Sequence, residues 1–227
     1  MKAKFFTVFC LIITMFAIIS CSAGKEEGSI SITLPSKEAL AREGISTNDD
    51  ADCCTIFITG DYTAKKRVAF IEGESATVNF DSIPEGAKVR VACTFNDPAE
   101  NNQAYGYIGV SDEITIVANE ALDASVAMSA IQFSNSLDVY NGYYAAKVFY
   151  GEEWESCLSL PSSCSYKFTF VNEFNEEDYP TRTYQTSSAL VNLSEDEGDD
   201  FACNYNVTVQ IFCNGTKILQ LFKSAVH

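Results

Sequence analysis

The feature that most constrains the fold is a series of short runs, rich in Val, Ile, Thr, Phe and Tyr, in which apolar and polar residues alternate. A period of two places every second side chain on one face, as in a half-buried β-strand. Gly, Pro, Asn or Asp follows most runs, as expected for turns. The runs lie at residues 29–34, 55–59, 66–71, 77–80, 88–95, 105–110, 113–117, 124–128, 145–150, 166–171, 181–185, 191–193, 205–213 and 218–222. The pattern predicts an all-β fold of antiparallel β-sandwiches, in which only residues 37–43 are weakly helical.

The two halves of the chain repeat one order of short strand, turn and long strand. In the first half, Pro84 and Gly86 lie between the runs at 77–80 and 88–95; in the second, an acidic turn precedes the long run at 205–213. Asn214-Gly215 then predicts a tight hairpin. This repetition predicts two β-sandwich units, residues 29–130 and 131–227, with a boundary near 130–141. The alternative is one larger sandwich in which generic strand patterns happen to resemble each other.

The N-terminus has the pattern of an export signal. Lys2 and Lys4 precede residues 5–19, which are almost wholly apolar. This stretch is shorter than a transmembrane helix requires, and its length and flanking charge are typical of a signal peptide. The sequence therefore predicts a signal peptide at residues 1–20.

The end of this signal, Ile18-Ile19-Ser20-Cys21, resembles the lipobox of bacterial lipoproteins. The resemblance implies cleavage before Cys21, acylation of Cys21 and anchoring to a membrane through the acyl chains. Residues 21–28 would then form a short tether. Ser22 is similar to the residue found in lipoproteins sent to the outer membrane, so we expect the protein in the cell envelope, at the outer membrane or cell surface. The alternative is an ordinary secretory signal, cleaved after Ser22 or Ala23.

The net charge of −16 limits the partners. A strongly acidic chain lacks the basic surface that nucleic acids require, so we expect no nucleic-acid partner. Loss of Lys2 and Lys4 with the signal changes the charge to −18. Such a charge repels anionic lipid, so only the acyl chains would hold the protein at a membrane.

Three segments of the first half resemble the transthyretin-like and immunoglobulin-like sandwich modules of exported bacterial proteins. They are the opening strand Gly28–Leu34, the corner Val78–Gly86 with its Ile83-Pro84-Glu85-Gly86 sequence, and the closing strand Glu113–Val117. The resemblance implies a sandwich fold over residues 28–130. It implies nothing about a ligand, because many functions occur on such folds.

The sequence contains 9 cysteines, of which Cys10 lies in the signal and Cys21 is the lipidation candidate. Exported proteins meet an oxidising compartment, where disulfides form. The disulfide candidates are Cys53, Cys54, Cys93, Cys157, Cys164, Cys203 and Cys213. We expect one bridge from Cys53 or Cys54 to Cys93 and two among the other four, with the connectivity open. The leftover thiol would be Cys53 or Cys54, because adjacent strand residues point to opposite faces.

The sequence offers few residues suited to catalysis or metal binding. The only histidine is His227, which excludes Ser-His-Asp and Cys-His catalysis and histidine metal ligands. The cysteine spacings do not fit structural zinc, and the acidic clusters do not fit the twelve-residue calcium loop. No phosphate-binding glycine loop or nucleophile elbow is present. We therefore expect no catalytic residues, no metal and no cofactor.

An aromatic stretch is the one candidate binding surface in the sequence. Its members are Tyr140, Tyr143, Tyr144, Tyr150 and Trp154. Exposed aromatic rings stack on sugars and protein partners, although alternate aromatics also line sandwich cores. The sequence thus predicts a membrane-anchored exported lipoprotein with a binding, adhesion or structural role and a protein or glycan partner. The alternatives are a carbohydrate-binding accessory module for a partner enzyme and a small carboxylate-dependent hydrolase.

Overall fold

The computed structural model describes residues 26–36, 38–39, 53–69, 74–95, 105–138, 143–150, 156–172, 180–193 and 205–224. These residues form fifteen β-strands, which confirms the predicted all-β fold. Of the predicted helix at 37–43, residues 38 and 39 are helical, and the rest lies outside the described residues.

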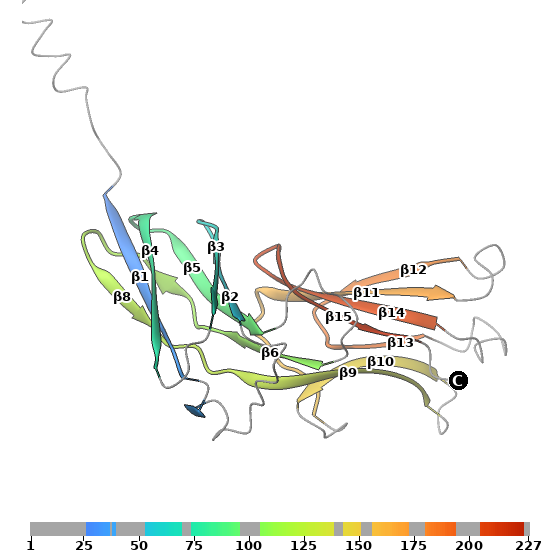
Figure 1. Ribbon diagram of the computed structural model, residues 1–227. Helices are drawn as coiled ribbons and strands as arrows, with labels where there is room; N and C mark the ends of the chain where they lie inside the picture. The colour runs from blue at the N-terminus through green and yellow to red at the C-terminus, as the bar shows by residue number, and fades with distance from the viewer. Residues whose placement is uncertain are drawn as a thin grey trace, which may run out of the picture.

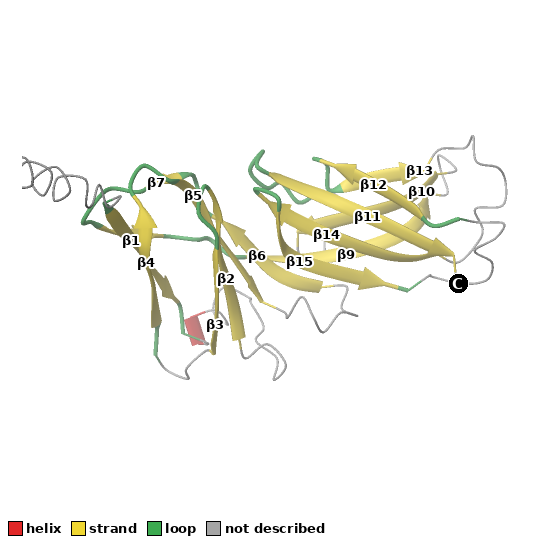
Figure 2. Ribbon diagram, turned by 90° about the horizontal axis from the view of Figure 1, so that it is seen from above, coloured by secondary structure: helices red, strands yellow, loops and turns green. Residues whose placement is uncertain are grey.

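The described strands form three sheets (Figures 1 and 2). The N-terminal sheet has the order β4 (Ala76–Pro84), β1 (Glu27–Leu34) and β8 (Ala121–Ala124). The central sheet has the order β13 (Leu190–Leu193), β10 (Tyr143–Tyr150), β9 (Ser129–Asp138), β6 (Tyr105–Val110), β5 (Lys88–Phe95), β2 (Cys53–Gly60) and β3 (Ala64–Ala69), and β7 (Ile114–Thr115) also pairs with β5. The C-terminal sheet has the order β12 (Arg182–Thr186), β11 (Cys164–Asn172), β14 (Tyr205–Cys213) and β15 (Thr216–Lys223). Neighbouring strands are antiparallel except β1 and β8, which are parallel.

Two hydrophobic cores lie against the central sheet. The N-terminal core includes Ile30 and Ile32 of the N-terminal sheet and Ile56 and Val91 of the central sheet. The C-terminal core contains the buried faces of β11 and β14, in which every second residue is buried. This alternation is the one that the sequence shows, because each of these strands has one face on the core.

Strands β2 and β5 belong to both cores. Ile56 and Ile58 of β2 face the N-terminal core, whereas Phe57 between them packs in the C-terminal core. On β5, Val91 likewise faces the N-terminal core, and Ala92 packs in the C-terminal core. Because successive strand residues point to opposite faces, the N-terminal and C-terminal sheets cover opposite faces of the central sheet at these strands.

The central sheet crosses the predicted boundary at residues 130–131. Strand β9 contains this boundary and pairs with β6 on one side and with β10 on the other. Figure 1 shows β6 and β9 running between the two ends of the molecule. The two predicted units are thus joined by a continuous hydrogen-bonded sheet.

Turn residues have the backbone conformations that their chemistry favours. Asn214 and Gly215 have φ values of 46° and 77°, which fit a type I′ turn and confirm the predicted hairpin between β14 and β15. Gly86 has φ 76° and donates its N–H to the Ile116 carbonyl oxygen. The predicted corner differs in one respect: β4 continues to Pro84, past a bulge at which Ser82 has φ 59°.

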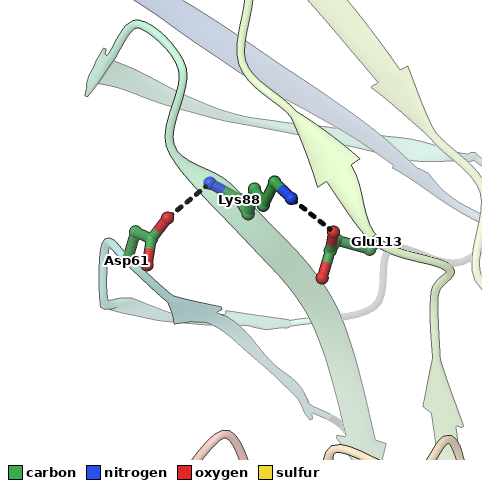
Figure 3. Close-up of polar contacts among 3 residues, drawn as sticks. All are labelled: Asp61, Lys88 and Glu113. Carbon is green, nitrogen blue, oxygen red and sulfur yellow. Dashed lines mark hydrogen bonds and ion pairs between the residues drawn. The ribbon is translucent and has the colours of Figure 1, made fainter.

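Polar contacts secure the outer end of β5 (Figure 3). The Lys88 backbone N–H donates to Asp61 Oδ2 at 3.0 Å, and Lys88 Nζ lies 3.8 Å from Glu113 Oε1. The side chains of this ion pair are 62% and 50% exposed, so water screens it and its contribution is at most about 1 kcal/mol. These contacts fix the strand end locally and contribute little to global stability.

Candidate functional site

An open acidic groove lies at one end of the N-terminal sheet. It has a volume of about 570 Å³ and is formed by the start of β1, the bulge of β4 and the turn before β8. The lining residues are Glu27, Gly28, Ser29, Asp81, Ser82, Asn119, Glu120 and Ala121. The start of β1 is hydrogen-bonded to the turn, because Ser29 N–H donates to the Glu120 carbonyl and Asn119 N–H donates to the Glu27 carbonyl. Three distant segments form the groove, so no local motif in the sequence indicates it.

The acidic side chains of the groove face solvent. The side chains of Glu27, Asp81 and Glu120 are exposed and therefore solvated. A general acid or base usually needs burial or a close charged partner to adjust its proton affinity. Among the described residues, no group of three or more His, Cys, Asp or Glu side chains could hold a metal ion. The groove is best described as a solvated acidic surface.

The predicted aromatic surface is only partly described. Tyr140 and Trp154 lie outside the described residues; Tyr143 and Tyr144 lie on β10, with side chains that are not described. Tyr150, also on β10, packs against the C-terminal core, donates its hydroxyl to the Ser159 carbonyl at 2.9 Å and accepts from the Ser159 N–H at 3.2 Å. Tyr150 therefore has an internal structural role, and a shared binding surface for the five aromatics stays a prediction.

The described cysteines fall into two buried pairs, Cys54 with Cys93 and Cys164 with Cys213, and two separate residues, Cys53 and Cys157. The six that the structure describes are free thiols, and Cys203 lies outside the described residues. In the N-terminal core, Cys54 forms a hydrogen bond with Cys93. Cys53, on the opposite face of β2, is partly buried, and Cys157 is exposed. No disulfide links the described cysteines, so the predicted bridge to Cys93 is not present in this structure. Of its two predicted partners, Cys54 is buried in the same core as Cys93, whereas Cys53 lies on the opposite face of β2.

The second pair, Cys164 and Cys213, lies in the C-terminal core beside a residue from the other half of the chain. The hydroxyl of Thr59, at the end of β2, donates to Cys213 Sγ at 3.3 Å, and Asn214 Nδ2 donates to the Thr59 hydroxyl at 3.3 Å. The buried Thr59 hydroxyl therefore both donates and accepts a hydrogen bond, as buried polar groups usually do. Thr59 is not predictable as a partner of Cys213, because no motif in the sequence connects two residues that lie 154 positions apart.

These contacts shift the pKa values of the two thiols in opposite directions. The hydrogen bond from the Cys164 thiol lowers the pKa of Cys213 against the effect of burial, and the Thr59 hydroxyl lowers it further. The same hydrogen bond and burial raise the pKa of Cys164. The Cys213 thiolate therefore forms at lower pH than the Cys164 thiolate.

No protein-family model matches the chain, and no curated protein matches its sequence. Among the described residues, no helix is both long and apolar enough to cross a membrane. The candidate sites must therefore be interpreted from their own geometry.

Proposed function

We propose that the protein is an exported lipoprotein, anchored to the bacterial cell envelope through acylated Cys21, with a non-catalytic binding, adhesion or structural role. The observation that carries this proposal is the Ile18-Ile19-Ser20-Cys21 sequence at the end of an apolar stretch that follows Lys2 and Lys4. An all-β fold with two cores suits such a role, because rigid sandwiches present loops to partners.

The position of β1 is consistent with a short anchor. This strand begins at Glu27, six residues after Cys21. It is the middle strand of the N-terminal sheet, hydrogen-bonded to β4 on one side and to β8 on the other. A middle strand is held on both edges, so the anchor would be connected to one of the best-secured strands of this sheet.

Membrane retention tests the anchor. In a bacterial host, Cys21→Ala should abolish incorporation of labelled palmitate and release the protein from membranes, because the acylated thiol is lost. Cys10→Ala is the matched control, since it removes a cysteine from the same apolar stretch, and it should leave labelling unchanged. The intact mass of the native protein should equal residues 21–227 plus acyl chains. An unlipidated mass that begins near Ala23 would contradict the proposal.

Glycan binding separates the accessory-module alternative from an adhesion or structural role. Ring stacking on sugars needs an exposed aromatic face, which Trp154 would provide. Binding on a glycan array that Trp154→Ala abolishes and Trp154→Phe retains would support the accessory role. A hydrolase would instead show turnover that is lost on a single Asp or Glu substitution, and we expect none across a panel of glycoside substrates.

A further inference from the structure

We infer that Cys164 and Cys213 form an intrachain disulfide that joins β11 to β14, while the other buried pair, Cys54 and Cys93, remains as thiols. The inference rests on the strand register and burial at the two pairs. Its occurrence in the cell also rests on the proposed export, because a disulfide persists only in an oxidising compartment.

The register places Cys164 and Cys213 directly opposite each other on two antiparallel strands. Both side chains are buried on the same face of the C-terminal sheet, with exposures of 3% and 0%. Opposite residues on one face are the closest cross-strand neighbours that a sheet provides.

The backbone hydrogen bonds show whether Cys164 and Cys213 form a hydrogen-bonded or a non-hydrogen-bonded pair of the antiparallel ladder. Asn214 N–H donates to the Ser163 carbonyl, so the neighbouring pair, Ser163 and Asn214, is the hydrogen-bonded one. Cys164 N–H donates to the Pro161 carbonyl and not to Cys213. Positions alternate along an antiparallel ladder, so Cys164 and Cys213 are a non-hydrogen-bonded pair, for which Cα atoms are typically about 4.5 Å apart. That separation lies within the range that a disulfide spans.

The pair in the N-terminal core has a different geometry. Cys54 lies opposite Phe95, and Cys93 lies opposite Ile56, so the two cysteines are diagonal neighbours on β2 and β5. Diagonal neighbours are typically about 7–8 Å apart, beyond the Cα separation that a disulfide allows without backbone movement. Both strands are buried on their two faces, which opposes such a movement. This pair therefore stays reduced, in contrast to the bridge that the sequence analysis expected to Cys93.

The proposed reaction is thiol–disulfide exchange with a disulfide reagent, such as oxidised glutathione or a disulfide-bearing oxidoreductase. While the C-terminal core is still open during folding, the Cys213 thiolate attacks one sulfur of the reagent, a mixed disulfide forms, and the first reagent thiol leaves. Cys164 then loses its proton and attacks the Cys213 sulfur, and the second reagent thiol leaves. The two protein thiols lose two electrons and two protons, and the reagent disulfide is reduced to two thiols.

The experiment uses the full chain isolated from its own membranes. The protein is reduced under denaturing conditions, refolded in the presence of oxidised glutathione, alkylated under denaturing conditions and mapped by mass spectrometry of non-reduced peptides. We expect a peptide that links Cys164 to Cys213, and alkylated Cys54 and Cys93. Alkylated Cys164 and Cys213, a link to another cysteine, or a Cys54–Cys93 link would each overturn the inference.

A second measurement does not depend on the peptide map. Reductant should lower the Tm of the oxidised wild type by about 5–15 °C and leave that of a Cys164→Ala/Cys213→Ala variant unchanged. An equal shift in both proteins would overturn the inference. A map of the protein before reduction tests export separately: thiols that are free in cells but link with glutathione would contradict the proposed compartment and support the pairing.

Discussion

Because β2 and β5 belong to both cores, we predict that the two cores unfold together. The perturbation is Phe168→Ala on β11, in the C-terminal core. Phe168 is fully buried, and its ring centroid lies 6.4 Å from those of Phe133 and Tyr166. Removal of such a ring leaves a cavity and costs about 3–5 kcal/mol.

Phe168→Ala should also destabilise the N-terminal core, because the central sheet belongs to both cores. Separation of the C-terminal sheet would expose Phe57, Ala92 and Ile108, which lie on central-sheet strands of the N-terminal half. Each large apolar side chain of this kind contributes about 1.5–3 kcal/mol through its burial. The hydrogen bond from the Thr94 hydroxyl to the Ile218 carbonyl, at 3.4 Å, would also be lost. The N-terminal core is therefore expected to lose several kcal/mol of its own stability.

The buried thiols provide a separate reporter for each core. Under reducing conditions, alkylation of Cys54 and Cys93 reports opening of the N-terminal core, and alkylation of Cys164 reports opening of the C-terminal core. In a urea series, Phe168→Ala should lower the urea concentration at both alkylation midpoints by about 1.5–2.5 M. This shift follows if the free energy of unfolding falls by about 2 kcal/mol per molar urea.

Two further variants make this prediction decisive. Ile32→Ala in the N-terminal core should also move both midpoints, because coupling between cores is reciprocal. Thr77→Ala on the exposed face of β4 should move neither. If Phe168→Ala moves only the Cys164 midpoint, the cores unfold separately and the reasoning from the shared sheet is wrong.

Three other predictions concern single contacts. Gly60→Ala should cost about 1–3 kcal/mol in urea unfolding, because Gly60 has φ 128° and an added Cβ would lie 2.3 Å from the Lys88 carbonyl oxygen. Asn214→Ala should cost about 1–2 kcal/mol by the same measurement, since the turn needs a positive φ and the hydrogen bond to Thr59 is lost. Thr59→Val should cost about 1–2 kcal/mol by the same measurement, because buried Cys213 Sγ and Asn214 Nδ2 both lose their hydrogen bond to the Thr59 hydroxyl; an unchanged urea midpoint would contradict the role of Thr59.

Three strands were predicted from the sequence with the bounds that the structure gives them. The predicted runs at 88–95, 105–110 and 205–213 have the bounds of β5, β6 and β14. Strand β9 was missed because, among its residues 129–134, whose side chains the structure describes, only Ile131 and Phe133 are buried. Strand β8 lies at 121–124 rather than 124–128, because its parallel pairing with β1, not its own side-chain pattern, determines where it forms.

The sharing of one sheet by two cores was not predicted, although the sequence contains a signal for it. Residues 54–59 of β2 are all buried, and so are residues 91–95 of β5. A continuous apolar run without polar alternation indicates a strand covered on both faces. The candidate sites were harder to predict, because the acidic groove and the contact between Thr59 and Cys213 bring together residues far apart in the chain.

The edges of the central sheet bear on how the protein would contact a partner. At one edge, β3 carries Lys65, Lys66 and Arg67 in succession, and all three are exposed. The ammonium groups of Lys65 and Lys66 lie 5.4 Å and 4.9 Å from the ring centroids of Phe57 and Phe80, so the cations cover one aromatic of each core. The other edge, β13, has only four residues. Cationic and short edges oppose pairing with a further strand, so a binding or structural role would use side chains and loops rather than extension of this sheet.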